Sequence, residues 1–164
     1  MTPDDLRALL ERLTQGPVVP TGVVRHVYLW HGDLDALAAL VPAALRQPLD
    51  LHALAQRLPR TPYALDEAQR LLRAEIEGEL QRQKEQAPSQ VLIVSGCGLL
   101  ARYHVPLQPF HAFASDRRVV ILAVSRQDSE FAPTVSLPEF IHLDQTATLT
   151  ALRVAVGEQN VVQG

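Results

Sequence analysis

The chain has 164 residues, 47% of them hydrophobic, and a formal net charge of −3 at pH 7, which fits one domain over residues 1–164 with a substantial core. No basic cluster stands out, so an autonomous nucleic-acid-binding domain is excluded and DNA is expected only as an indirect partner. The lone cysteine, the lack of a signal peptide and the lack of an apolar run of roughly 18–20 residues predict a cytoplasmic protein that does not enter the membrane.

The first half of the chain predicts alternating helices and strands. A capped amphipathic helix is expected over 3–13, followed by a β-branched and aromatic strand over 23–30. A second helix begins at Asp33 or Asp35 and extends to Leu45, with Pro42 as a kink or early end. A short strand at 48–51 leads into a helix at 53–58. The clearest element is a long surface helix over 65–85, whose apolar residues recur at helical spacing.

The second half predicts two strong strands, over 90–94 and 118–124, with a short helix over 106–114 between them. The segments 137–143 and part of 146–156 are expected to be short strands at the sheet edge, although the second also fits a helix. Alternation of this kind predicts an α/β fold, with a parallel sheet covered by helices on both faces.

Ligands of open α/β sheets bind beyond the carboxyl ends of the strands, where the loops 30–35, 95–98 and 125–128 should converge. A phosphate-binding loop at the first of these needs glycines that let backbone N–H groups surround the phosphates, and a lysine that neutralises them. The junction instead contains one glycine and two carboxylates, and the only lysine of the chain, Lys84, is far away. The eight junction residues are Trp30, His31, Gly32, Asp33, Leu34, Asp35, Ala36 and Leu37.

The strand over 90–94 shows a matching loss. In a working P-loop ATPase this strand ends in an acidic residue that holds Mg²⁺, whereas here it ends in Ser95, with Gly98 three residues further on. Because the lysine loop and the strand-end acid are absent together, we expect the protein neither to bind nor to hydrolyse ATP, and to use no cofactor or metal. The six histidines do not have the spacing of a metal-ligand pair on one helix.

The order of these elements, with the runs 48–51, 90–100, 106–107 and 115–123, resembles the small P-loop protein of the type 3 bacteriophage-exclusion (BREX) system over roughly residues 3–143. The resemblance implies a P-loop NTPase core of the AAA+ or RecA-like kind. Members carry Gly-x-x-x-x-Gly-Lys-Thr and a strand-end Asp followed by Glu. Aligned without gaps, the second glycine, lysine and threonine fall on Asp35, Ala36 and Leu37, and the Asp and Glu fall on Ser95 and Gly98.

The resemblance therefore implies a pseudo-ATPase with degenerate Walker motifs, acting in antiviral defence through protein–protein interactions. Its partners would be the larger ATPase, methyltransferase and phosphatase-like subunits of a prokaryotic defence complex, and a homo-oligomer is compatible with this role. The candidate contact residues are two arginine pairs. Arg70 and Arg73 lie on the long helix, and Arg117 and Arg118 precede the strand over 118–124.

Two alternatives stay open at the level of sequence. The first is a small enzyme in which Cys97, between two glycines after a buried strand, is the nucleophile and His104, with Asp116, completes a triad. The second is a clamp-loader-like AAA+ adaptor in DNA replication or repair, which keeps the fold without hydrolysis. A reactive thiol at Cys97 would favour the enzyme over either non-catalytic role.

Overall fold

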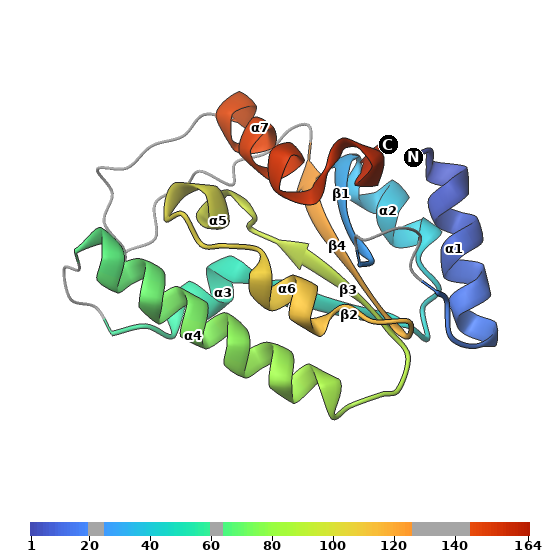
Figure 1. The fold of residues 1–164 in the computed structure, drawn as a ribbon, viewed down its shortest axis with the longest axis horizontal. Helices are drawn as coiled ribbons and strands as arrows, with labels where there is room; N and C mark the ends of the chain where they lie inside the picture. Colours follow the sequence, from blue (N-terminus) through green and yellow to red (C-terminus); the bar gives the residue numbers. More distant parts are fainter. Residues whose placement is uncertain (20–24, 60–63, 126–144) are drawn as a thin grey trace.

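The computed structural model describes residues 1–19, 25–59, 64–125 and 145–164 (Figure 1). The helices are α1 (Pro3–Gln15), α2 (Leu34–Leu40), α3 (Leu51–Gln56), α4 (Leu65–Lys84), α5 (Gly98–Arg102), α6 (Gln108–Phe113) and α7 (Gln145–Val156), with a 3₁₀ turn, η1, at Glu158–Asn160. The strands are β1 (Val27–Gly32), β2 (Arg46–Asp50), β3 (Gln90–Ser95), β4 (Arg118–Ser125) and β5 (Val161–Gln163).

The five strands form one parallel sheet in the order β2-β3-β4-β1-β5. Helices α1 and α2 cover one face, where Leu10 and Leu37 pack with Trp30 of β1. The other face carries α3 to α7 (Figure 1), whose apolar residues share a core with the alternate positions of β1, β3 and β4. The predicted α/β class, with a parallel sheet and helices on both faces, is confirmed.

Local sequence explains why the two longest described helices, α1 and α4, form where they do. At the start of α1 the Thr2 hydroxyl accepts the Asp5 N–H at 3.1 Å, and the Asp5 carboxylate accepts the Thr2 N–H at 2.9 Å, which is a complete capping box. In α4 the buried residues recur every four positions, at Ala68, Leu72, Ile76 and Leu80. The predicted long helix at 65–85 is therefore confirmed.

The outer edge of the sheet at β2 carries a proline at its centre. The Leu45 carbonyl accepts the Val91 N–H at 2.7 Å, so in the parallel ladder Pro48 is one of the residues whose backbone faces away from β3. A proline there removes an outward N–H without removing a ladder hydrogen bond. The missing outward N–H therefore disfavours pairing of β2 with a strand from another chain.

The C-terminal part of the chain forms the helix α7 and the short strand β5. The expected edge strand within 146–156 is wrong and the helical alternative is confirmed, because Thr148, Leu152 and Val156 recur every four residues and are buried on one side of the helix α7. The expected strand at 137–143 lies outside the described residues. The strand β5 was not predicted. It pairs with β1, and the Asn160 side chain next to it donates to the Val27 carbonyl at 2.9 Å.

Among the described residues, no helix is both long enough and apolar enough to cross a membrane.

Candidate functional site

The junction between β1 and α2 is one residue long. Trp30, His31 and Gly32 belong to the strand, Asp33 follows, and the helix begins at Leu34. The predicted phosphate-loop position is thus divided between a strand and a helix, and Asp35, Ala36 and Leu37 are helical residues. A loop that closes around phosphates needs several residues of free backbone, which this junction does not have.

Asp33 occupies the place where an anion would bind to α2. Its Oδ1 accepts the backbone N–H of Asp35 at 3.0 Å, and its carbonyl accepts the indole N–H of Trp30 at 3.1 Å and the N–H of Leu37 at 3.2 Å. The N-terminus of a helix favours a negative group, and the Asp33 carboxylate already supplies it. A phosphate would have to displace this carboxylate and would also meet Asp35, so the junction repels anions.

The end of β1 is also closed by the backbone at Gly164. The Gly164 N–H donates to the His31 carbonyl at 3.0 Å, and a Cβ at Gly32 would lie 2.6 Å from the Gly164 oxygen. A Cβ at Gly164 would in turn lie 2.0 Å from the Trp30 ring. Both glycines are therefore required by close packing between β1 and the residue after β5.

The predicted strand-end acidic position is also at the carboxyl edge, on β3, and β4 separates it from β1 by roughly 10 Å. Ser95 is the last residue of β3 and Gly98 is the first of α5. Gly96 between them has a positive φ of 73°, which glycine adopts without strain. Neither Ser95 nor Gly98 can supply a carboxylate. The third predicted loop, 125–128, lies outside the described residues after Ser125.

Sequence reasoning missed the two polar side chains that lie beside Ser95. Asp50 pairs in register with Ser95, and its Oδ1 accepts the His52 N–H at 3.0 Å. The His52 ring lies over Gly96, where a Cβ would come within 2.7 Å of it. The sequence signal was the acidic residue that ends the short strand and caps α3. Asp50 is thus the carboxylate next to Ser95, although it serves as a helix cap.

The three residues proposed for a cysteine enzyme are not assembled. The Cys97 side chain is fully buried, and its thiol donates to the Val94 carbonyl at 3.3 Å. His104 is exposed, and Asp116 precedes β4 at the amino edge of the sheet, roughly 15–20 Å from the edge that carries Cys97. A fully buried thiol is poorly accessible to a substrate, so the described geometry does not favour Cys97 as a nucleophile.

Of the predicted arginine contacts, Arg117 and Arg118 lie at the opposite, amino edge of the sheet, where β4 begins. The Arg118 Nε donates to the Phe113 carbonyl at 2.7 Å, and its guanidinium lies 5.3 Å from the centre of the Phe113 ring. Arg117, which is exposed, lies beside it at the amino edge. Arg73 is bonded to Glu77 and Gln108 within the chain, whereas Arg70 is 70% exposed and 4.0 Å from its nearest carboxylate. Arg70 is therefore the freer of the two predicted contacts on α4.

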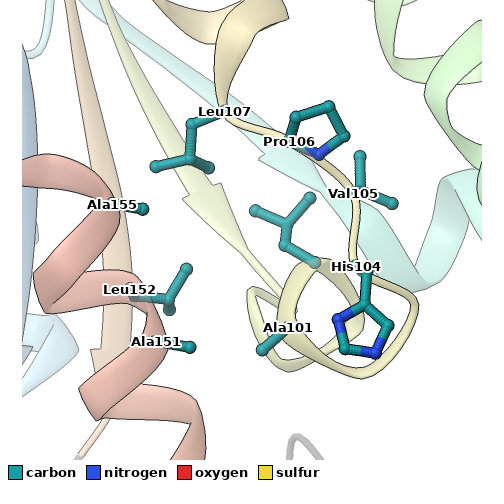
Figure 2. A pocket seen from close by; sticks show the side chains of 9 residues that line it. Ala101, His104, Val105, Pro106, Leu107, Ala151, Leu152 and Ala155 are labelled. Carbon is teal, nitrogen blue, oxygen red and sulfur yellow. The ribbon is translucent and has the colours of Figure 1, made fainter.

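A pocket of about 260 Å³ opens between α7 and the segment that joins α5 to α6. Figure 2 shows Ala151, Leu152 and Ala155 of α7 facing Ala101 and Leu107 across it, with His104 at the rim. His104 has a positive φ of 52°, and its carbonyl accepts the Gln69 side chain of α4. The walls are apolar and the one titratable group is an imidazole, so this pocket can hold an apolar group and has no paired acid and base for catalysis.

Within the described part of the chain, no group of three or more His, Cys, Asp or Glu residues could hold a metal ion. No family model, curated protein or solved structure matches the chain. The site is consequently defined by its geometry alone: a sheet edge with a capped helix, a serine at the end of β3, and an apolar pocket.

Proposed function

We propose that the chain is a non-catalytic, P-loop-like subunit of a prokaryotic phage-defence complex of the BREX type, acting through contacts with other proteins. The observation that carries the non-catalytic part is Asp33. Its carboxylate caps α2 one residue after β1, where a nucleotide phosphate would need free N–H groups. The sheet order, with β1 flanked by other strands and separated from β3 by β4, is consistent with a P-loop-like core.

The end of β3 supports the same proposal. Magnesium bound to a nucleotide needs a carboxylate at this position, and Ser95 offers only a hydroxyl. Asp50 is on the neighbouring strand and is engaged by the His52 N–H. Among the described residues, the end of β1 therefore offers no phosphate cradle and the end of β3 no metal-holding acid.

The defence role and the partner subunits rest on the resemblance in the order of elements. The geometry supports a role in binding, because the described ends of β1 and β3 carry neither a phosphate cradle nor a strand-end acid. The clamp-loader-like adaptor in DNA replication or repair is the other non-catalytic function. The defence subunit and the adaptor differ in the phenotype that loss of the protein would cause.

Calorimetry with Mg-ATP tests the non-catalytic part. We expect no heat beyond dilution up to near-millimolar nucleotide, and micromolar affinity would overturn the proposal. The triple variant Asp35→Gly, Ala36→Lys, Leu37→Thr should also fail to bind, since all three positions are helical. It should in addition be less stable, because Leu37 is only 1% exposed and a threonine there puts a hydroxyl into the core.

Phage challenge of the native host tests the defence role. Deleting the gene should raise plating efficiency of phage, and complementation with the wild-type chain should restore exclusion. Sensitivity to DNA damage with unchanged phage plating would instead support the adaptor. For the binding mode, Arg70→Glu should reduce co-purification of partner subunits, with Arg7→Glu on α1 as the matched control, because exposed charges change association more than stability. Full retention of every partner by Arg70→Glu would remove α4 from the proposed interface.

A further inference from the structure

A second hollow lies between α4 and α6, two helices that run side by side in Figure 1. It has a volume of about 170 Å³ and an apolar floor that includes Leu80 and Phe113, both buried. Glu77 and Lys84 of α4 line its two ends. They are seven residues apart, which is two helical turns or roughly 10 Å, so both are on the same side of α4.

The two charges at the ends of this groove differ in how they are satisfied. Glu77 accepts the Arg73 Nε at 2.9 Å and its side chain is still 51% exposed. Lys84, the only lysine of the chain, forms no salt bridge with any described residue. The groove therefore presents an available cation at one end and a partly available anion at the other, at equal distances from its midpoint between Leu80 and Gln81.

Gly78 follows Glu77 on α4 and is exposed, and no contact with the described residues requires a glycine there. A Cβ there would meet only the Arg82 guanidinium, at 3.9 Å, and the helical backbone does not require a glycine. Glycine is a poor helix former, so Gly78 lowers the stability of α4 and no described contact compensates for this. Ala74, one turn earlier, is also small and exposed. Small residues one turn apart allow the backbone of another helix to come close.

We propose that this face binds a second copy of the chain, with the two α4 helices antiparallel across a twofold axis near Gln81. In a twofold interface the same patch is used by both copies, so each contact must be complementary to itself under the rotation. An axis at the midpoint of the groove places Glu77 opposite Lys84 of the partner subunit, and the converse pair forms on the other side. This symmetry of opposite charges favours a second copy over an unrelated protein as the occupant, and the inference does not depend on the proposed defence role.

Charge reversal with sedimentation analysis tests the interface. The wild type should form a dimer between micromolar and near-millimolar concentration. Glu77→Lys replaces two attractive pairs by two repulsive ones, so the dissociation constant should rise about tenfold or more. The double variant Glu77→Lys, Lys84→Glu exchanges the charges and should recover dimerisation. Glu67→Lys, the same change on the same helix but outside the groove, should leave the dissociation constant unchanged.

The rescue by the double variant separates the proposal from a structural effect. Glu77→Lys also loses the Arg73 contact, and the double variant does not restore that contact, so recovery can come only from pairing between copies. A wild type that stays monomeric at every concentration would overturn the proposal and leave the groove to a partner of different sequence. A double variant that dimerises no better than Glu77→Lys would also overturn it.

Cross-linking gives an independent measurement, because Lys84 is the only lysine. A carbodiimide activates a carboxylate and joins it to the lysine amine with loss of water, which the reagent takes up as a urea. In a mixture of ¹⁴N and ¹⁵N protein, we expect mixed-isotope peptides that link Lys84 to Glu77. Lys84→Arg should give none. Mixed-isotope links from Lys84 only to other carboxylates would refute the antiparallel arrangement.

Discussion

Gly32→Ala is the substitution whose effect the structure specifies most closely. An alanine Cβ would lie 2.6, 2.7 and 2.8 Å from the O, C and Cα of Gly164, all of them backbone atoms. An ordinary contact begins at 3.4 Å, so the Gly164 segment must retreat by about 0.8 Å. This movement strains or breaks the hydrogen bond from the Gly164 N–H to the His31 carbonyl, currently 3.0 Å long.

We expect Gly32→Ala to lower the free energy of unfolding by about 1–3 kcal/mol. Overpacking of a tight site costs about 1–3 kcal/mol, and the strained hydrogen bond contributes about 1 kcal/mol. The smaller entropy of the unfolded alanine chain offsets about 0.4–1 kcal/mol of this. Gly78→Ala is the matched control, because its Cβ would make only an ordinary contact of 3.9 Å with the Arg82 guanidinium, and it should raise the free energy of unfolding by up to about 1 kcal/mol.

The measurement is urea unfolding followed by circular dichroism and by fluorescence, at a concentration at which every variant is monomeric. Trp30 is the only tryptophan and its ring contacts Gly164, so its emission reports locally on the displaced segment. Gly164→Ala displaces the same segment. The double variant should therefore be less destabilised than the sum of the two single variants by about 1 kcal/mol or more. Equal or higher stability of Gly32→Ala, or strict additivity in the double variant, would refute the packing argument.

Three further outcomes follow from buried groups. Burial lowers the pKa of His26 and of His111, so below the ordinary histidine pKa of 6.5 the unfolded chain binds more protons than the folded chain. The free energy of unfolding should therefore fall as the pH drops below 6.5. Adding His26→Gln to a His111→Gln variant should flatten the slope of this free energy against pH between pH 6.5 and 5. Cys97 should react with iodoacetamide far more slowly in the native protein than in denaturant, and equal rates by mass spectrometry would reopen the cysteine-enzyme alternative. Gly96→Ala should be destabilised by about 1–3 kcal/mol because of its positive φ and the His52 ring, and His52→Ala should relieve the steric part; an unchanged urea midpoint would contradict this.

The strong periodic segments could be predicted from sequence because their local pattern and their tertiary environment agree. The apolar runs that became β3 and β4 are central strands buried on both faces, and the four-residue spacing in α4 matches its buried side. α7 was misread because its threonines and valines are typical of strands, whereas its burial pattern is helical. β5 has only three residues, so its pairing with β1 gives no periodic signal of its own.

The candidate site was predicted in outline and missed in its contacts. The absence of a lysine and of a strand-end acid could be read from the residues alone. The length of the β1–α2 junction could not, because Asp33 and Asp35 were both acceptable starts for the helix. The approach of Gly164 to Gly32 and of His52 to Gly96 joins residues more than 40 positions apart, and no local pattern encodes such contacts.

Under the proposed non-catalytic role, the single-residue connection after β1 also limits which mutations could introduce nucleotide binding. Substitutions at 35–37 change side chains on a helix whose Asp35 N–H is already bonded to the Asp33 carboxylate, so they do not lengthen the connection into a loop. New backbone must be inserted after Gly32, and the same event must move Asp33 away from the helix end. Acquiring phosphate binding at this junction would therefore require an insertion in frame, because base changes alone alter side chains and leave the length of the connection unchanged.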